Sequence, residues 1–360
     1  MQSAENHRHA LVTLPRQAFD MSYPPLFRIK ENGYFGFINS GGEIAVEPQF
    51  LEVGEFREGF THARLNGQWA ILDQYGRLYI RRLYRSVGKF HNGRARVQVV
   101  HSWGFIDYAC REVILTIFDE VSDFHEGLSA VTFEGRAGYI SEDGSFAIKP
   151  QFSASGKFVG DIAPAAKNGV WGFINRQGEY VVSPAWDKAS SFQGDVAVVS
   201  KNGLWGLADR SGKELVTPRF QFVKGLAEGK FSDGMAMAYR EGKYGYVSES
   251  GEVAIEPMFD MAGDFGEGLA LVEINGAYGY IDKTGKLVIM PKYEDAGIFS
   301  EGVAQICNNG KWGYIDSDGR IIIPAIYDMA EPFRDGLALV ALNGKWSYIN
   351  RDRETIWQEK

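Results

Sequence analysis

The sequence GVAQICNNGKWGYIDSDGRIIIPAIYDMAEPF, residues 302–333, decides the fold because most of the remaining chain repeats it. Its centre is the pair Trp312-Gly313. The corresponding anchor positions are Phe35, Trp69, Trp103, Ala137, Trp171, Trp205, Tyr244, Tyr278, Trp312 and Trp346. Successive anchors are evenly spaced along the chain, except for one longer step from Trp205 to Tyr244. Such a constant period indicates a tandem array of ten repeats, each of them one supersecondary unit.

Each repeat reads as a short antiparallel meander. In the copy around Tyr278 the predicted elements are a strand over 269–274, a hairpin turn at Asn275-Gly276, a strand over 277–281, a turn over 282–285 and a strand over 287–290. Pro291 is expected to end the third strand because proline cannot donate to a ladder. The remainder, 292–302, crosses to the next copy as a loop or as a short fourth strand, and both alternatives stay open.

A phenylalanine stands at one position of every segment that links two repeats. These residues are Phe56, Phe90, Phe124, Phe158, Phe192, Phe231, Phe265, Phe299 and Phe333. A ring that recurs in nine segments is expected to fill the space between neighbouring repeats. Replacing one such ring by Ala should cost about 3–5 kcal/mol.

The array is expected to be all-β, with an open solenoid or superhelix favoured over a closed β-propeller-like ring. A propeller blade usually has four strands and about 40 or more residues, so a period of roughly 34 is short. The predicted organisation is an irregular lead-in or cap over 1–25, one array over 26–357 and a tail over 358–360. Within the lead-in, Val12 to Pro15 followed by Phe19 resembles the end of a repeat, which favours an extra strand or a cap there.

Composition limits the classes of function. The net charge of the 360 residues is -8, and an acidic surface repels nucleic-acid backbones. The two cysteines, Cys110 and Cys307, have no metal-binding or disulfide spacing. No apolar run is long enough for a secretory signal or a membrane span. We therefore expect a cytoplasmic protein that binds neither nucleic acid nor membrane.

The repeated pattern resembles the bacterial WG-repeat family, also called KWG repeats. The best matching stretches are Asn309 to Asp316, NGKWGYID, and Asn168 to Asn175, NGVWGFIN. The resemblance covers about residues 26–357, and it departs from the motif at Ala137 and at Trp346-Ser347. It implies a β-rich tandem-repeat module, and it transfers no catalytic residue.

Two departures from the repeat mark candidate contact sites for a partner protein. The first is a short insertion within Gln221 to Ser232, since insertions in repeat proteins often map to a binding face. The second is a basic segment without Asp or Glu between residues 74 and 106, whose Arg side chains suit an acidic partner or a phosphate. The candidate residues are Arg77, Arg81, Arg82, Arg85, Arg94, Arg96, Lys224, Glu228 and Lys230.

No nucleophile, metal or phosphate-binding motif occurs in the chain. The early histidines, His62, His91, His101 and His125, occupy different repeat positions, and no metal site is expected from them. The sequence therefore predicts a non-enzymatic scaffold without cofactor that binds another protein, with neutralisation or docking of a bacterial toxin or effector as the narrower version. The alternative is a carbohydrate or cell-wall binding module, because exposed aromatic rings stack on sugars.

Overall fold

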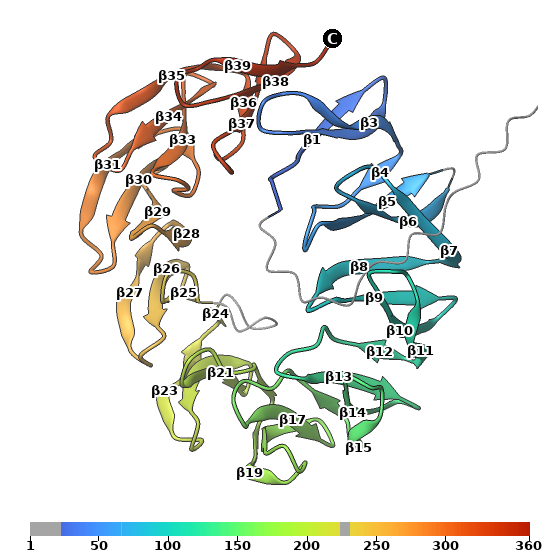
Figure 1. Ribbon diagram of the computed structural model, residues 1–360. Helices are drawn as coiled ribbons and strands as arrows, with labels where there is room; N and C mark the ends of the chain where they lie inside the picture. The colour runs from blue at the N-terminus through green and yellow to red at the C-terminus, as the bar shows by residue number, and fades with distance from the viewer. Residues whose placement is uncertain (1–22, 66, 224–230) are drawn as a thin grey trace, which may run out of the picture.

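The computed structural model describes residues 23–65, 67–223 and 231–360 of the chain. Within these residues the strands form ten small antiparallel sheets, nine with four strands and one with three. These sheets, called blades 1 to 10 in chain order, follow one another around a ring (Figure 1). Among the described residues, no helix is long and apolar enough to cross a membrane.

The strands of each blade are hydrogen-bonded in chain order, from the centre of the ring outward (Figure 1). The innermost strands are β4 (Glu52–Val53), β8 (Ser86–His91), β12 (Glu120–Val121), β16 (Ala154–Ser155), β20 (Lys188–Ala189), β24 (Phe222–Val223), β28 (Met261–Gly266), β32 (Asp295–Ala296) and β36 (Met329–Ala330). The strands next to them are β1 (Phe27–Glu31), β5 (Phe60–Leu65), β9 (Arg94–Val99), β13 (Leu128–Phe133), β17 (Ala163–Lys167), β21 (Val196–Lys201), β25 (Met235–Arg240), β29 (Leu269–Ile274), β33 (Val303–Asn308) and β37 (Ala338–Leu342).

The third strand of each blade carries the anchor residue. These strands are β2 (Tyr34–Ile38), β6 (Gln68–Asp73), β10 (Ser102–Asp107), β14 (Arg136–Ser141), β18 (Val170–Ile174), β22 (Leu204–Asp209), β26 (Lys243–Ser248), β30 (Ala277–Asp282), β34 (Lys311–Asp316) and β38 (Lys345–Ile349). The outermost strands are β3 (Ile44–Phe50), β7 (Leu78–Tyr84), β11 (Glu112–Phe118), β15 (Phe146–Phe152), β19 (Tyr180–Trp186), β23 (Glu214–Phe220), β27 (Val253–Phe259), β31 (Leu287–Tyr293), β35 (Ile321–Tyr327) and β39 (Thr355–Gln358).

The outer strand does not end at the proline, so that expectation was wrong. β31 continues through Pro291 to Tyr293. The pairing of β30 with β31 shifts register on both sides of Tyr280, which is a β-bulge next to Gly279. A Cβ on Gly279 would lie 2.5 Å from the carbonyl oxygen of Ile289 and 2.7 Å from the nitrogen of Pro291. The Gly and Pro of the motif therefore serve one bulge, and the outer edge of a sheet needs no N–H from the proline.

The last blade shows why a copy can lack this glycine. Ser347 stands at the Gly position of blade 10, and it pairs directly with Gln358 in β39. The register shift of this blade falls later, between Tyr348 and Ile349, so β39 is not bulged opposite Ser347 and a side chain is tolerated there.

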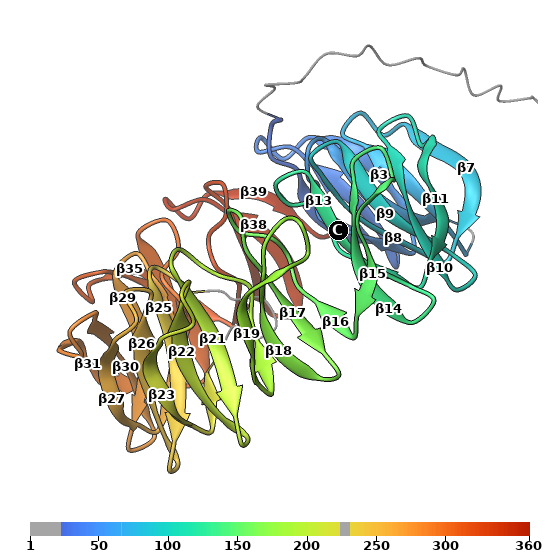
Figure 2. The same ribbon diagram turned by 90° about the horizontal axis from the view of Figure 1, so that it is seen from below.

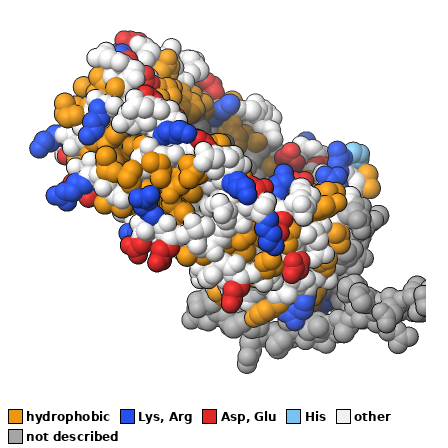
Figure 3. All heavy atoms as spheres, turned by 90° about the horizontal axis from the view of Figure 1, so that it is seen from above, with side chains coloured by type: hydrophobic (Ala, Val, Ile, Leu, Met, Phe, Trp, Pro, Cys, Tyr) orange, Lys and Arg blue, Asp and Glu red, His pale blue; other side chains and the backbone are white. Residues whose placement is uncertain are grey.

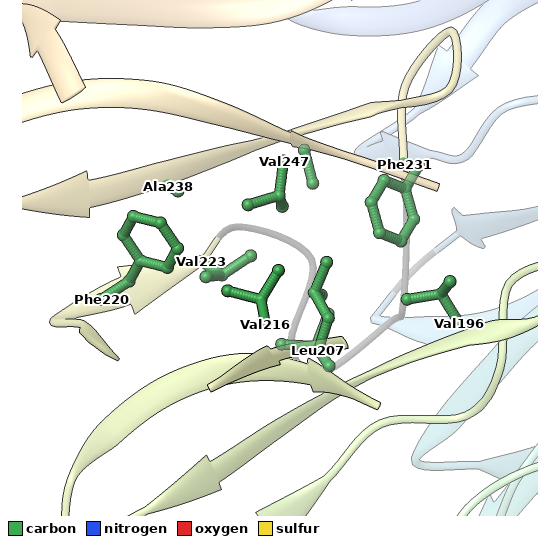
Figure 4. Packing of buried hydrophobic residues seen from close by; sticks show 10 residues of the cluster. Val196, Leu207, Val216, Phe220, Val223, Phe231, Ala238 and Val247 are labelled. Carbon is green, nitrogen blue, oxygen red and sulfur yellow. The ribbon is translucent and has the colours of Figure 1, made fainter. Parts of the chain in front are cut away.

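The hydrophobic core lies between blades, where each cluster joins two successive sheets. Figure 4 shows one such cluster, in which Leu207 and Phe220 of blade 6 pack with Val223, Phe231 and Val247 of blade 7. The linking phenylalanines are buried, as predicted, except for the half-buried Phe56. Each linking segment also supplies the innermost strand, which in most blades is only a residue pair such as Glu52–Val53. Because the innermost strand is so short and lies within the linking segment, a repeat of this length can form a four-stranded blade.

The ring is closed, so the favoured open solenoid was wrong and the alternative, a closed propeller-like ring, is correct. Phe27 and Ile29 of blade 1 pack in one cluster with Leu337 and Tyr348 of blade 10. The Tyr348 hydroxyl donates a hydrogen bond of 2.9 Å to the carbonyl oxygen of Arg28. Among the described residues no strand is exchanged between these blades. Within the described ranges, side-chain contacts rather than a shared strand close this junction, and Figure 2 shows that the ring is not flat.

Candidate functional site

The repeated motif is used in folding, as the copy in blade 9 illustrates. Asn309 and Gly310 adopt positive φ values of 51° and 68°, which form the primed hairpin turn that the sequence predicts. Lys311 is ion-paired with Asp328 of blade 10. The buried Tyr314 donates a hydrogen bond of 2.7 Å to the carbonyl oxygen of Glu331 in the next linking segment. These four residues of the motif therefore stabilise the turn and the contact with the next blade.

In most blades the turn before the second strand carries an acidic residue, and its role was missed from the sequence. Glu301 accepts a hydrogen bond of 3.1 Å from the amide of Gly336, which is the same turn in the next blade. Asp233 does the same with Gly268 at 2.6 Å and also binds Lys283 at 2.9 Å. The sequence does contain the pattern that gives rise to these contacts. The acidic residue of one repeat is followed, one repeat later, by a Gly whose amide donates to it. In several copies an Arg, Lys or Tyr after the third strand of that next repeat also contacts the carboxylate. These contacts hold neighbouring blades together.

The basic segment does not form one patch among its described side chains. Arg94 lies over the ring of Phe124, 5.1 Å from its centroid, and Arg96 binds Asp123 at 2.6 Å. Both contacts join blade 3 to blade 4. Arg77 pairs with Asp73 of its own turn at 2.6 Å.

The other predicted contact residues are dispersed or not described. Arg85 contacts His101 at 3.2 Å and lies at the opposite end of β7 from Arg77, roughly 26 Å away along the strand at about 3.3 Å per residue. The side chains of Arg81 and Arg82, and the whole stretch 224–230, lie outside the described part of the chain. That stretch holds the remaining candidates Lys224, Glu228 and Lys230, so their role stays a prediction.

The histidines do not converge either. In the described part of the chain, no group of three or more His, Cys, Asp or Glu side chains is placed to hold a metal ion. His62 is mostly buried against the edge of Trp69, with ring centroids 5.1 Å apart, and burial lowers the pKa of its imidazole. His62 and His125 belong to blades 2 and 4, and His91 and His101 belong to blade 3.

Apolar side chains are exposed on the outer strands of three consecutive blades. We call this set the rim patch: Met258 on β27, Val288 and Met290 on β31, and Ile321, Ile322 and Ile326 on β35. Met258, Met290 and Ile321 are 61%, 64% and 65% exposed. Figure 3 shows hydrophobic side chains gathered on the lobe at the left, the side where β31 and β35 lie in Figure 1. Exposed apolar patches are one kind of surface through which proteins interact.

A cavity of about 720 Å³ lies at the junction of blades 1 and 10. Its wall includes Tyr23, Phe56, Phe333 and Tyr348. The carboxylate of Glu55 at this wall accepts from Lys89 and, at 3.2 Å, from Arg334 of blade 10. The hydrogen bond from Lys89 is the main reason why the pKa of Glu55 lies below its usual value.

Comparison with known proteins identifies the repeat. The profile described as WG containing repeat matches residues 35–69, 103–136, 138–171, 171–205, 205–244, 244–276, 278–312 and 312–346, which is most of the chain. No curated protein matches the sequence.

Solved structures resemble the chain only distantly in sequence. A crystal structure of the eukaryotic initiation factor is 11% identical, with a TM-score of 0.55 over 94% of this chain and 96% of that one. Dihydro-heme d1 dehydrogenase NirN in complex with DHE is 13% identical, with a TM-score of 0.41 over 98% and 76%. The first likeness shows the fold alone, a closed propeller ring, and the second is too remote to carry an argument.

Proposed function

Because the chain belongs to the WG containing repeat family and folds as a ten-bladed β-propeller, we propose that it is a non-enzymatic scaffold that binds another protein through the rim patch. The observation that carries this proposal is the exposure of six Val, Ile and Met side chains on three neighbouring outer strands. Removing apolar surface from water contributes roughly 25 cal/mol per Å². The centre of a protein interface is rich in such side chains.

The same position of other blades shows that the fold does not require an apolar residue there. Met290 stands directly before the proline of its outer strand, and the residues at this position in β19 and β23 are the exposed Ser183 and Thr217. The outer strand tolerates polar side chains at its exposed positions, so the fold requires neither the apolar run on β27, β31 and β35 nor the exposed Val113, Leu115 and Ile117 of β11. A covered interface supplies an explanation for the rim patch.

The test is capture of a partner from the native host with three tagged proteins: the natural chain, Met290→Glu/Ile322→Glu, and the matched control Ser183→Glu/Thr217→Glu. Each double variant adds two carboxylates to exposed outer-strand positions. We expect a stoichiometric partner that the natural chain and the control retain and the rim variant loses. A partner retained by the rim variant, or no protein captured by the natural chain, contradicts the proposal.

The narrower version, in which the scaffold neutralises or docks a bacterial toxin or effector, is supported by the net charge of -8. An acidic protein attracts a basic partner and speeds their encounter. Binding of such a partner should weaken as salt is raised from low ionic strength, because salt screens exposed charges. Salt-independent binding would leave the rim patch as the source of affinity and remove the support for a basic partner.

A further inference from the structure

Six blades carry an acidic residue followed by Gly in the turn before the second strand, and five of these carboxylates bind the next blade. Each of the five accepts a hydrogen bond from a backbone amide of the same turn one repeat later. Asp233 also binds the ammonium of Lys283 in the next blade at 2.9 Å. This position of the fold therefore recognises an N–H group and, in several blades, a cation as well. The five residues are Glu58, Glu126, Asp233, Glu267 and Glu301, and the sixth is Asp335 of blade 10.

Blade 1, which follows blade 10 around the ring, provides neither partner for Asp335. The pairing registers of β1 with β2 and of β37 with β38 place Phe27 and Ala338 at the same position of their blades. Pro25 therefore stands where the donating Gly stands in other blades, and proline has no N–H to donate. Ser40, which carries no charge, stands where several other blades carry the cation.

Asp335 and Pro25 both line the cavity at the junction of blades 1 and 10. Among the residues that the structure describes, the ion pair of Asp335 is with Nε of Arg334, at 3.9 Å. The same guanidinium binds Glu55 of blade 2 at 3.2 Å. The carboxylate of Asp335 therefore has the capacity to accept a hydrogen bond from a donor that enters the cavity.

The same cavity offers an apolar surface. Phe56 and Phe333 line its wall. Phe56 is half-buried there, whereas the other linking phenylalanines are buried. The volume of about 720 Å³ lies within the range of small-molecule sites, which combine apolar walls with a few polar groups. A small ligand with an apolar body therefore fits the cavity.

The charged side chains at the wall favour a cation. Arg334 is paired with Glu55, and Arg28 lies over the ring of Phe35, 5.5 Å from its centroid. Carboxylates outnumber guanidinium groups in the wall, and such an excess attracts cations and disfavours anions. The carboxylates are those of Glu55, Glu58, Glu331 and Asp335, and the guanidinium groups are those of Arg28 and Arg334.

We propose that this cavity binds a small organic amine. The ammonium group donates to the carboxylate of Asp335 and takes the place of the amide and the cation that the other turn acids bind. Its apolar body packs against Phe56 and Phe333. A charge-assisted hydrogen bond of this kind is stronger than one between neutral groups. The site is separate from the rim patch, so this binding does not depend on the proposed partner protein.

The test is isothermal titration calorimetry of the full chain with two primary amines, 2-phenylethylamine and hexylamine, at pH 7. Both probes are protonated at this pH, as lysine is. The neutral alcohol 2-phenylethanol is the control ligand, because it keeps the ring and lacks the charge.

Two matched variants locate the site. Asp335→Asn keeps the size of the side chain and removes its charge. Asp352→Asn makes the same change at an exposed residue of blade 10 that does not line the cavity. Since Asp335 is itself exposed, both variants are expected to fold.

We expect saturable binding of at least one amine at a single site of the natural chain and of Asp352→Asn. Asp335→Asn should bind that amine about tenfold to a hundredfold more weakly, the range for loss of a hydrogen bond to a charged group. The affinity of the natural chain for 2-phenylethanol should be lower by a similar factor. Failure of both amines to bind, equal affinity of Asp335→Asn and the natural chain, or equal affinity for amine and alcohol would each overturn the proposal.

Discussion

Replacing Tyr280 by Phe should lower the free energy of unfolding by about 1 kcal/mol, the typical net contribution of one hydrogen bond. Tyr280 is fully buried, and its hydroxyl donates to the carbonyl oxygen of Gly297 at 2.7 Å. Phenylalanine keeps the ring, which packs edge-on against Phe299 with centroids 4.9 Å apart. The substitution therefore removes the bond between blades 8 and 9 and leaves their packing in place.

The alanine variant separates the ring from the hydroxyl. Tyr280→Ala removes both, and truncation of a buried aromatic ring costs about 3–5 kcal/mol. The assay is urea unfolding followed by circular dichroism, with stability compared at unchanged slope. Tyr34→Phe, at a residue 44% exposed, is the control and should stay within roughly 0.5 kcal/mol of the natural chain. Equal losses for Tyr280→Phe and Tyr280→Ala would refute the assignment of most of the stability to ring packing.

Two further substitutions test the bulge and the contacts between turns. Gly313→Ala places a Cβ 2.5 Å from the carbonyl oxygen of Ile323, so overpacking should lower the free energy of unfolding by about 1–3 kcal/mol in thermal unfolding. The control, Ser347→Ala, should change it little. Equal losses in the two variants would contradict the role of the bulge. Glu58 is partly buried, which alone would raise its pKa, but hydrogen bonds from Tyr108 and two amides lower the pKa below its ordinary value of 4.5. The stabilisation by the Glu58 carboxylate is present above pH 4.5 and is lost as pH falls through the lowered pKa. Glu58→Gln should therefore have a lower melting temperature than the natural chain at neutral pH, and the difference should shrink on acidification. A difference in melting temperature that is unchanged at low pH would contradict this.

The parts of the fold that depend on neighbouring residues were predicted from the sequence. Asn275-Gly276 indicated a hairpin turn, and both residues have positive φ. The mostly apolar run at 269–274 indicated a strand, and β29 has those bounds. The prediction failed at Pro291, because the absence of an N–H matters only where a neighbouring strand would accept it, and the sequence does not show which edge of a sheet faces solvent.

The candidate surface depended more on tertiary contacts. Arg94 and Arg96 looked available in the sequence, but each meets a partner in the next blade. In contrast, Met290 and Ile322 look like ordinary strand residues, and only their place on the outer edge exposes them. Whether a side chain is buried between blades depends on residues a full repeat away in the sequence. The alternation of polar and apolar residues within one strand therefore does not predict this burial.

By itself, the sequence determined the number of repeats, the strands and turns within each repeat, and the rings that pack between them, since these follow from local backbone preference and from a period that recurs along the chain. Only the tertiary structure decided whether the array closes. Closure depends on a rotation between successive blades that each junction sets through packing, and the ten rotations accumulate around the ring. No single copy of the motif encodes that sum, so an open and a closed array share the same repeat until Phe27 meets Tyr348.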